Sequence, residues 1–93
     1  MIPHNYKQII LDKTKVLAPR QVAIFGSYAR GEQTDKSDLD ILIDTDARFT
    51  LLDLIGIEQE LTHLLSVKVD LVTKRSLSPY FKSYIEKDLL SIS

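Results

Sequence analysis

The sequence predicts a small α+β domain in which helices pack on a mixed β-sheet. Short runs rich in Val, Ile and Leu alternate with longer segments whose apolar residues recur at helical spacing. Turn-forming residues separate most of these segments, and 93 residues leave room for only one core. The expected order is α-β-β-α-β-α, in a single domain over residues 1–93.

Apolar spacing and helix-capping residues set the expected boundaries of the elements. The chain is expected to begin with a helix of about twelve residues, capped by Asn5 and ended by Pro19. A strand over 22–25 follows and is broken by Gly26-Ser27. A single helical turn over 28–30 and a polar surface loop over 32–37 complete the first half. In the second half the expected elements are a strand over 39–43, a helix capped by Thr50 that reaches about Leu65, a strand over 67–73, and a last helix that starts at Ser78-Pro79 and whose apolar face runs to Ile92.

Composition and charge exclude several classes of protein. The net charge of −1 argues against a chain that holds duplex nucleic acid by neutralising phosphates, so no direct nucleic-acid binding by this chain is expected. No apolar run approaches the ~18 residues of a membrane span, and the N-terminus lacks the apolar core of a signal peptide. The absence of cysteine fits a reducing cytoplasm.

Three carboxylates interrupt otherwise apolar strands: Asp38, Asp40 and Asp70. Side chains alternate along a strand, so Asp38 and Asp40 share one face while the apolar residues between and after them point into the core. If the strand with Asp70 lies beside the strand with Asp40, all three converge at one end of the sheet. Like charges this close repel each other, which predicts a cation at this position, and Mg²⁺ prefers such oxygen ligands.

The Gly26-Ser27 turn after the first strand supplies the features of a phosphate site. Glycine lets the backbone approach a phosphate closely, a serine hydroxyl can bond to it, and a following helical turn favours anions. The same dipeptide is also compatible with an ordinary turn. An EF-hand is excluded because Leu42 and Ile43 stand where the calcium loop needs further polar ligands and glycine, and a P-loop is excluded because no Gly-Lys-Ser/Thr follows the glycines.

Taken together, these residues resemble a known superfamily. Gly26-Ser27, ten intervening residues and Asp38-Leu39-Asp40, with Asp70 in a later strand, are similar to the nucleotidyltransferases of DNA polymerase β type. More narrowly, residues 26–31 with 37–40 resemble the minimal nucleotidyltransferases, the antitoxins of HEPN–MNT toxin–antitoxin pairs. The resemblance spans essentially the whole chain.

The resemblance implies a function and a set of site residues. It implies transfer of AMP from ATP to a tyrosine of a partner HEPN toxin, whose RNase activity is thereby silenced. Gly26 and Ser27 would bind the triphosphate, with Arg30 as a further phosphate or structural contact. Asp38 and Asp40 would hold two Mg²⁺ ions. Asp70 would ligate one ion and act as general base on the incoming hydroxyl.

Two other functions stay open at this stage. The chain can be a binding module that neutralises its partner by occlusion, or an autoregulator that binds DNA, although it has neither a helix-turn-helix signature nor a basic face. Tyr28, next to Ser27, is a candidate acceptor of the nucleotide. Tyr80, Phe81 and Tyr84 of the last helix are candidates for the partner surface or for the core.

Overall fold

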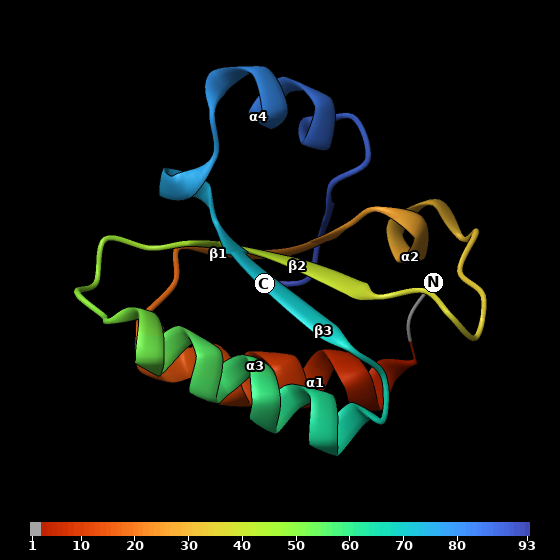
Figure 1. The fold of residues 1–93 in the computed structure, drawn as a ribbon, viewed down its shortest axis with the longest axis horizontal. Helices are drawn as coiled ribbons and strands as arrows, with labels where there is room; N and C mark the ends of the chain where they lie inside the picture. Colours follow the sequence, from red (N-terminus) through yellow and green to blue (C-terminus); the bar gives the residue numbers. More distant parts are fainter. Residues whose placement is uncertain (1–2) are drawn as a thin grey trace.

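The computed structural model describes residues 3–93 and shows a four-stranded sheet with helices on both faces (Figure 1). Met1 and Ile2, part of the predicted domain range, lie outside the described residues. Two helices cover one face of the sheet, and one short helix lies over the other. The elements are α1 (His4–Thr14), β1 (Gln21–Phe25), α2 (Ser27–Arg30), β2 (Leu39–Asp44), α3 (Leu51–Leu65), β3 (Val69–Thr73), α4 (Pro79–Glu86) and β4 (Leu90–Ser91), with 3₁₀ turns η1 (Lys15–Leu17) and η2 (Lys74–Ser76).

The sheet is mixed, as predicted, with the strand order β3-β2-β1-β4. β1 pairs antiparallel with β2, which is joined to it by a loop and the single turn of α2. β2 and β3 are parallel, because α3 carries the chain back to the starting end of the sheet. The third strand therefore lies beside the second, which is the condition for Asp70 to join Asp38 and Asp40 at one end of the sheet.

The core lies between the sheet and the layer formed by α1 and α3. The predicted inward residues of β2, which are Leu39, Ile41 and Ile43, are all fully buried. They belong to one continuous cluster with apolar side chains from the neighbouring strands and from both helices. The opposite face of β2 carries Asp40, which is only partly buried. The face of the sheet that contacts α1 and α3 thus forms the core, and the opposite face carries the polar side chain of Asp40.

Helix α3 is fixed against the edge of the sheet by polar side chains as well as apolar ones. At its N-terminus Thr50 and Asp53 form a reciprocal capping box, which confirms Thr50 as the cap. Farther along, Thr62 accepts the Val69 N–H at 3.0 Å and Glu58 accepts the Leu71 N–H at 2.8 Å. β3 is the edge strand, so these contacts satisfy donors that have no strand partner. This explains why Glu58 interrupts the apolar stripe.

The predicted end of the last helix is wrong. Helix α4 stops at Glu86, and the following residues form β4 on the free edge of β1. The Ile92 N–H donates to the Val22 carbonyl at 2.9 Å, and the Ser93 hydroxyl accepts the Val22 N–H at 2.9 Å. Ile92 is buried by this strand pairing rather than by a helical face. Unpaired donors and acceptors on β1 therefore outweigh continuation of the helix.

Two other predicted boundaries also change. Asn5 lies inside α1 and does not cap it, because extended Pro3 precedes the helix and its carbonyl accepts the Tyr6 N–H at 3.1 Å. The third strand begins at Val69 rather than at residue 67, since residues 66–68 turn the chain out of α3. Ser78 caps α4 as predicted.

Within residues 3–93, no helix combines the length and the apolar character needed to cross a bilayer.

Candidate functional site

The site starts from a row of side chains that crosses the sheet on the face turned toward α4. In the strand register Asp40 of β2 stands beside Phe25 of β1 on one side and beside Asp70 of β3 on the other. Paired residues on neighbouring strands lie about 5 Å apart and point to the same face. Asp38 comes two positions earlier than Asp40, just before β2 begins, and its charge acts on both Asp40 and Asp70. The predicted convergence of the three carboxylates at one end of the sheet is confirmed.

The electrostatics of this row are those of uncompensated acids. Burial, reinforced by the nearby charges of Asp70 and Asp38, raises the pKa of Asp40 to about 6. Burial also raises the pKa of Asp70, against the opposing effect of Lys68. The one ion pair in this group joins Lys68 Nζ to Asp38 Oδ2 at 3.7 Å, at an exposed position. A cation placed between these carboxylates would relieve their repulsion.

The turn after β1 presses directly against Asp40. Gly26 has φ +76°, a conformation that side-chain-bearing residues rarely adopt. A Cβ at this position would lie 2.5 Å from Asp40 Oδ2, so glycine is required by space as well as by conformation. Ser27 then opens α2, whose single turn is closed by Gly31 at φ +72°. The predicted phosphate turn and the predicted metal-binding carboxylate are therefore immediate neighbours.

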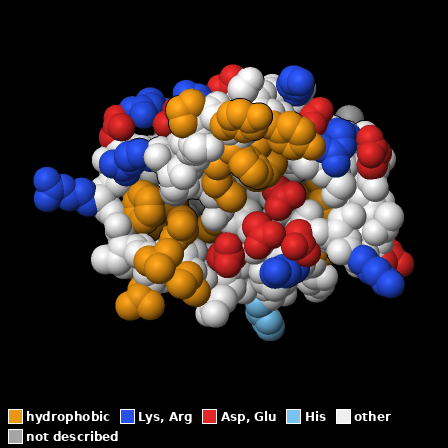
Figure 2. Space-filling model, turned by 45° about the horizontal axis from the view of Figure 1, so that its top comes forward, with side chains coloured by type: hydrophobic (Ala, Val, Ile, Leu, Met, Phe, Trp, Pro, Cys, Tyr) orange, Lys and Arg blue, Asp and Glu red, His pale blue; other side chains and the backbone are white. Residues whose placement is uncertain are grey.

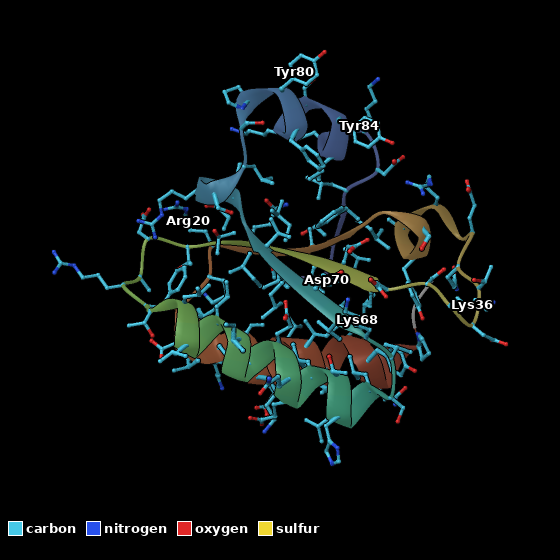
Figure 3. The ribbon with its side chains drawn as sticks, viewed as in Figure 1. Arg20, Lys36, Lys68, Asp70, Tyr80 and Tyr84 are labelled. Atoms are coloured by element: carbon cyan, nitrogen blue, oxygen red, sulfur yellow. The ribbon has the colours of Figure 1, made fainter. Side chains whose placement is uncertain are left out.

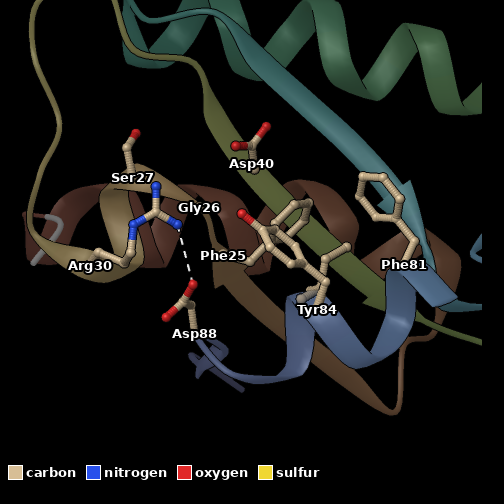
Figure 4. Close-up of a pocket in the computed structure, with 9 residues that line it drawn as sticks. Phe25, Gly26, Ser27, Arg30, Asp40, Phe81, Tyr84 and Asp88 are labelled. Atoms are coloured by element: carbon tan, nitrogen blue, oxygen red, sulfur yellow. Dashed lines mark hydrogen bonds and ion pairs between the residues drawn. The ribbon is translucent and has the colours of Figure 1, made fainter.

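A pocket of about 320 Å³ connects these parts with α4 (Figure 4). Gly26, Ser27, Arg30 and Asp40 form one part of its lining. The other lining residues are Phe25, Phe81, Tyr84, Ile85 and Asp88. Arg30 spans the opening, where its Nη1 donates to Asp88 Oδ2 at 3.2 Å, and this bond raises the pKa of the guanidinium. Figure 2 shows acidic side chains gathered beside a hydrophobic patch on this side of the molecule.

The structure brings together most of the residues predicted from the sequence. Gly26, Ser27, Arg30 and Asp40 line the pocket. Asp70 of β3 adjoins Asp40 of β2, and Figure 3 shows it near Lys68, which immediately precedes β3. Asp38, Asp40 and Asp70 belong to this acidic group, but the first and last do not line the pocket itself.

Tyr28 does not fit the role of a nucleotide acceptor. Its side chain is 8% exposed and belongs to the hydrophobic core. Burial raises the pKa of its hydroxyl, which makes it a poorer nucleophile. Tyr28 therefore anchors α2 to the core.

Sequence reasoning missed the second wall of the pocket. Phe81, Tyr84 and Asp88 come from α4 and the residues just after it, a segment predicted only as partner surface or core. Their spacing of three and four residues was the available signal, because it places all three on one helical face. Tyr80, four residues before Tyr84, does not line this pocket but lines a separate one together with Tyr84.

The residues present fit Mg²⁺ by chemistry, since hard cations take carboxylate oxygens. The burial of Asp40 among like charges supports the same assignment. In residues 3–93 no three acidic, histidine or cysteine side chains are already gathered into a ligand set. Asp38, Asp40 and Asp70 are thus neighbouring donors whose side chains must turn toward an ion to hold it.

Comparison with known proteins gives a consistent result. A model of the nucleotidyltransferase domain matches residues 5–92. Protein MJ0126 of Methanocaldococcus jannaschii, provisionally assigned as a protein adenylyltransferase, is 50% identical over 92 residues, which cover 98% of this chain and 91% of that protein. The protein adenylyltransferase MntA of Thermococcus cleftensis is 46% identical over 71 residues, 76% of this chain and 68% of MntA.

A solved structure agrees with these relatives. One chain of a toxin–antitoxin complex crystallised with AMP-PNP superposes on this fold with a TM-score of 0.83 and 25% sequence identity, covering 94% of this chain and 72% of that chain. The match of the family model over residues 5–92 establishes that the chain belongs to the nucleotidyltransferase domain family.

Proposed function

We propose that this chain is a Mg²⁺-dependent protein adenylyltransferase that transfers AMP from ATP to a tyrosine of a HEPN-type RNase toxin and so acts as the antitoxin. The observation that carries the proposal is the placement of Asp40 between Asp70 and the Gly26-Ser27 turn. A half-buried carboxylate among like charges, beside a backbone turn, suits a metal-bound triphosphate. It has no evident value for packing.

Each residue of the site has a proposed role. The backbone at Gly26 and the hydroxyl of Ser27 hold the triphosphate, and Arg30 contributes a positive charge at the pocket opening. Asp38, Asp40 and Asp70 fit two Mg²⁺ ions. When bound, these ions neutralise the phosphate charge that develops during transfer.

The transfer itself is a displacement at the α-phosphorus. The acceptor phenol oxygen forms a bond to that phosphorus, the bond to the bridging oxygen breaks, and pyrophosphate leaves. The phenolic proton passes to Asp70, the general base of the proposed site. The products are an AMP–tyrosine phosphodiester on the partner and free pyrophosphate.

A protein acceptor is supported by the relatives. MJ0126 and MntA both carry the name of protein adenylyltransferases, and the structure with AMP-PNP is a toxin–antitoxin complex. We propose a hetero-oligomeric complex with the toxin, located in the cytoplasm, where ATP and Mg²⁺ are available and a cysteine-free chain has no need of disulfides.

Label transfer tests this function. The chain and its co-purifying partner are incubated with Mg²⁺ and with ATP labelled at either the α or the γ phosphate. Label on the partner from the α position alone, abolished by the double variant Asp38→Ala/Asp40→Ala, supports the proposal. Label from γ alone means phosphoryl transfer and contradicts it. A stable complex with label from neither position means neutralisation by occlusion.

A further inference from the structure

The pocket has two chemically different halves. One half consists of the Gly26-Ser27 turn with Arg30 and Asp40, and it is polar and charged. The other half is mainly apolar and aromatic, with Phe25, Phe81, Tyr84 and Ile85, and Asp88 is its one charged member. The proposed function assigns an occupant to the polar half only. A nucleoside triphosphate has a matching division, since its phosphates are charged and its base is a flat, uncharged ring.

The aromatic half is open rather than filled by the protein. Phe81 is 55% exposed and Tyr84 is 66% exposed, although both line a pocket. Their rings contact each other edge to face, with centroids 6.3 Å apart and an interplanar angle of 61°. Such a pair leaves a ring face available to a third aromatic group.

Helix α4 is held in place on both sides of this pair. Ile85 is buried, at 4% exposure, and lines the pocket together with Phe25 of β1. Just beyond the helix, Asp88 bonds to Arg30 of α2, so the aromatic wall is tied directly to the turn that forms the polar half (Figure 4). The two halves therefore keep a fixed relation, as recognition of both ends of one ligand requires.

We propose that α4 is the nucleobase wall of the site, with the base of ATP stacked on the ring of Tyr84 and bordered by Phe81, while the triphosphate lies at Gly26-Ser27. This inference rests on the proposed function, because it assumes that a nucleotide occupies the polar half. It makes α4 part of the substrate site rather than a surface for the partner protein.

The position of Tyr80 favours a base over a protein partner. Tyr80 is the most exposed aromatic of α4, at 92%, yet it does not line the pocket. Tyr80 and Tyr84, four residues apart on α4, also line a separate pocket together, so only the lining of the first pocket distinguishes them. A general protein-binding face would use both rings, whereas a nucleobase can reach only the ring that faces the pocket. Tyr80 is thus a matched control for Tyr84.

The test is equilibrium binding of two probes, ATP and inorganic tripolyphosphate, each with Mg²⁺, to the full chain. Stacking on one aromatic ring predicts that Tyr84→Ala weakens ATP binding by about 5- to 100-fold. The same variant leaves the affinity for tripolyphosphate unchanged, since that ligand has no base. Tyr84→Phe, which keeps the ring, retains ATP binding, and Tyr80→Ala binds both probes like the wild type. Phe81→Ala weakens ATP selectively, by less than Tyr84→Ala.

The outcomes separate this proposal from the function on which it rests. If Tyr84→Ala binds ATP as the wild type does, or loses affinity for both probes equally, the base does not stack on α4. The proposed triphosphate site at Gly26-Ser27 is not contradicted by that result. If Tyr80→Ala and Tyr84→Ala release the co-purified partner while ATP binding is intact, α4 is a protein interface. If the wild type binds neither probe, the proposed function fails as well. Thermal melting of each variant confirms that the exposed substitutions leave the fold intact.

Discussion

Strand β2 carries acidic side chains at both ends, and the two groups have opposite surroundings. At its end, Asp44 accepts from Arg20 at 3.0 Å and lies 3.9 Å from Lys74, while Asp46 in the following loop is also paired with Arg20. At its start, Asp40 forms no ion pair within residues 3–93, and burial with the charges of Asp70 and Asp38 outweighs the opposing effect of Arg30 on its pKa. Figure 3 shows Arg20 at one end of the sheet and Asp70 with Lys68 at the other.

The difference appears in the acidity of the two groups. The hydrogen bonds and charge of Arg20 lower the pKa of Asp46, whereas burial and like charges raise the pKa of Asp40 to about 6. The acids at the end of β2 are satisfied by the chain itself. Those at its start remain unsatisfied until a ligand supplies positive charge. Acidic side chains therefore point to a metal site only where the fold leaves them without internal partners.

The largest predicted effect concerns activity. Asp40→Asn removes a charge that the transfer needs, and we expect a loss on the order of 10³-fold or more, since a metal ion contributes several kcal/mol at the transition state. Asp44→Asn is the matched control on the same strand and keeps near wild-type activity. Transfer of α-label to the partner measures both. Equal losses in the two variants would remove the functional distinction between the ends of β2.

The next effect concerns metal-dependent stability. Under the proposed function Mg²⁺ would bind the folded chain at the carboxylate row, and a concentration of about 100 times Kd would then add about 2.7 kcal/mol to the free energy of unfolding. Asp40→Asn loses most of this gain, and Asp44→Asn keeps it. Melting curves with Mg²⁺ and with EDTA give the comparison. A gain that survives Asp40→Asn would place the metal elsewhere.

A smaller effect concerns stability without metal. The folded-state pKa of Asp40, about 6, exceeds the usual 3.8, so between these values the folded state binds more protons and stability falls as pH rises. At pH 7 Asp40→Asn should therefore raise the free energy of unfolding by ~1–2 kcal/mol, after allowance for partial exposure. Below about pH 4 the advantage disappears. Denaturant unfolding at both pH values checks this, and a destabilised variant at pH 7 would contradict it.

The smallest predicted effect is on stability, at the end of β2 where Arg20 pairs with the acidic side chains. Asp46→Asn removes an exposed partner of Arg20 and leaves the ion pair with Asp44, so only a slight drop in melting temperature is expected. The sign is opposite to that of Asp40→Asn in EDTA at pH 7. High salt should reduce the drop, because it screens exposed charges. An increase in melting temperature would show that this end of β2 is also repulsive.

The alternation of polar and apolar residues within single strands was enough to predict much of the candidate site. The period of two along β2 places Asp38 and Asp40 opposite Leu39 and Ile41, because a one-residue slip would bury the acids. The position of Asp70 followed from the need to pair a third apolar strand with the second. Gly26 was marked as a turn residue, although its close approach to Asp40 emerges only from the structure.

The parts that could not be predicted depend on distant contacts. β4 has only two residues, too few for a periodic signal, and it forms because the edge of β1 is free. The placement of α4 over the pocket involves Arg30 and Asp88, which are 58 residues apart. No local propensity encodes such a pair. The aromatic residues of α4 were visible in the sequence, but their orientation toward the nucleotide pocket was not.

A cation site at the start of β2 is tested most directly by the pKa of Asp40, measured by carboxyl NMR with and without Mg²⁺. Asp46 in the same spectra is the internal reference. We expect a pKa near 6 for Asp40 without metal and a clear fall when Mg²⁺ is added, while the pKa of Asp46 stays below its usual value and is unaffected. An ordinary pKa for Asp40 that does not respond to Mg²⁺ would contradict the claim that this end of β2 awaits a cation.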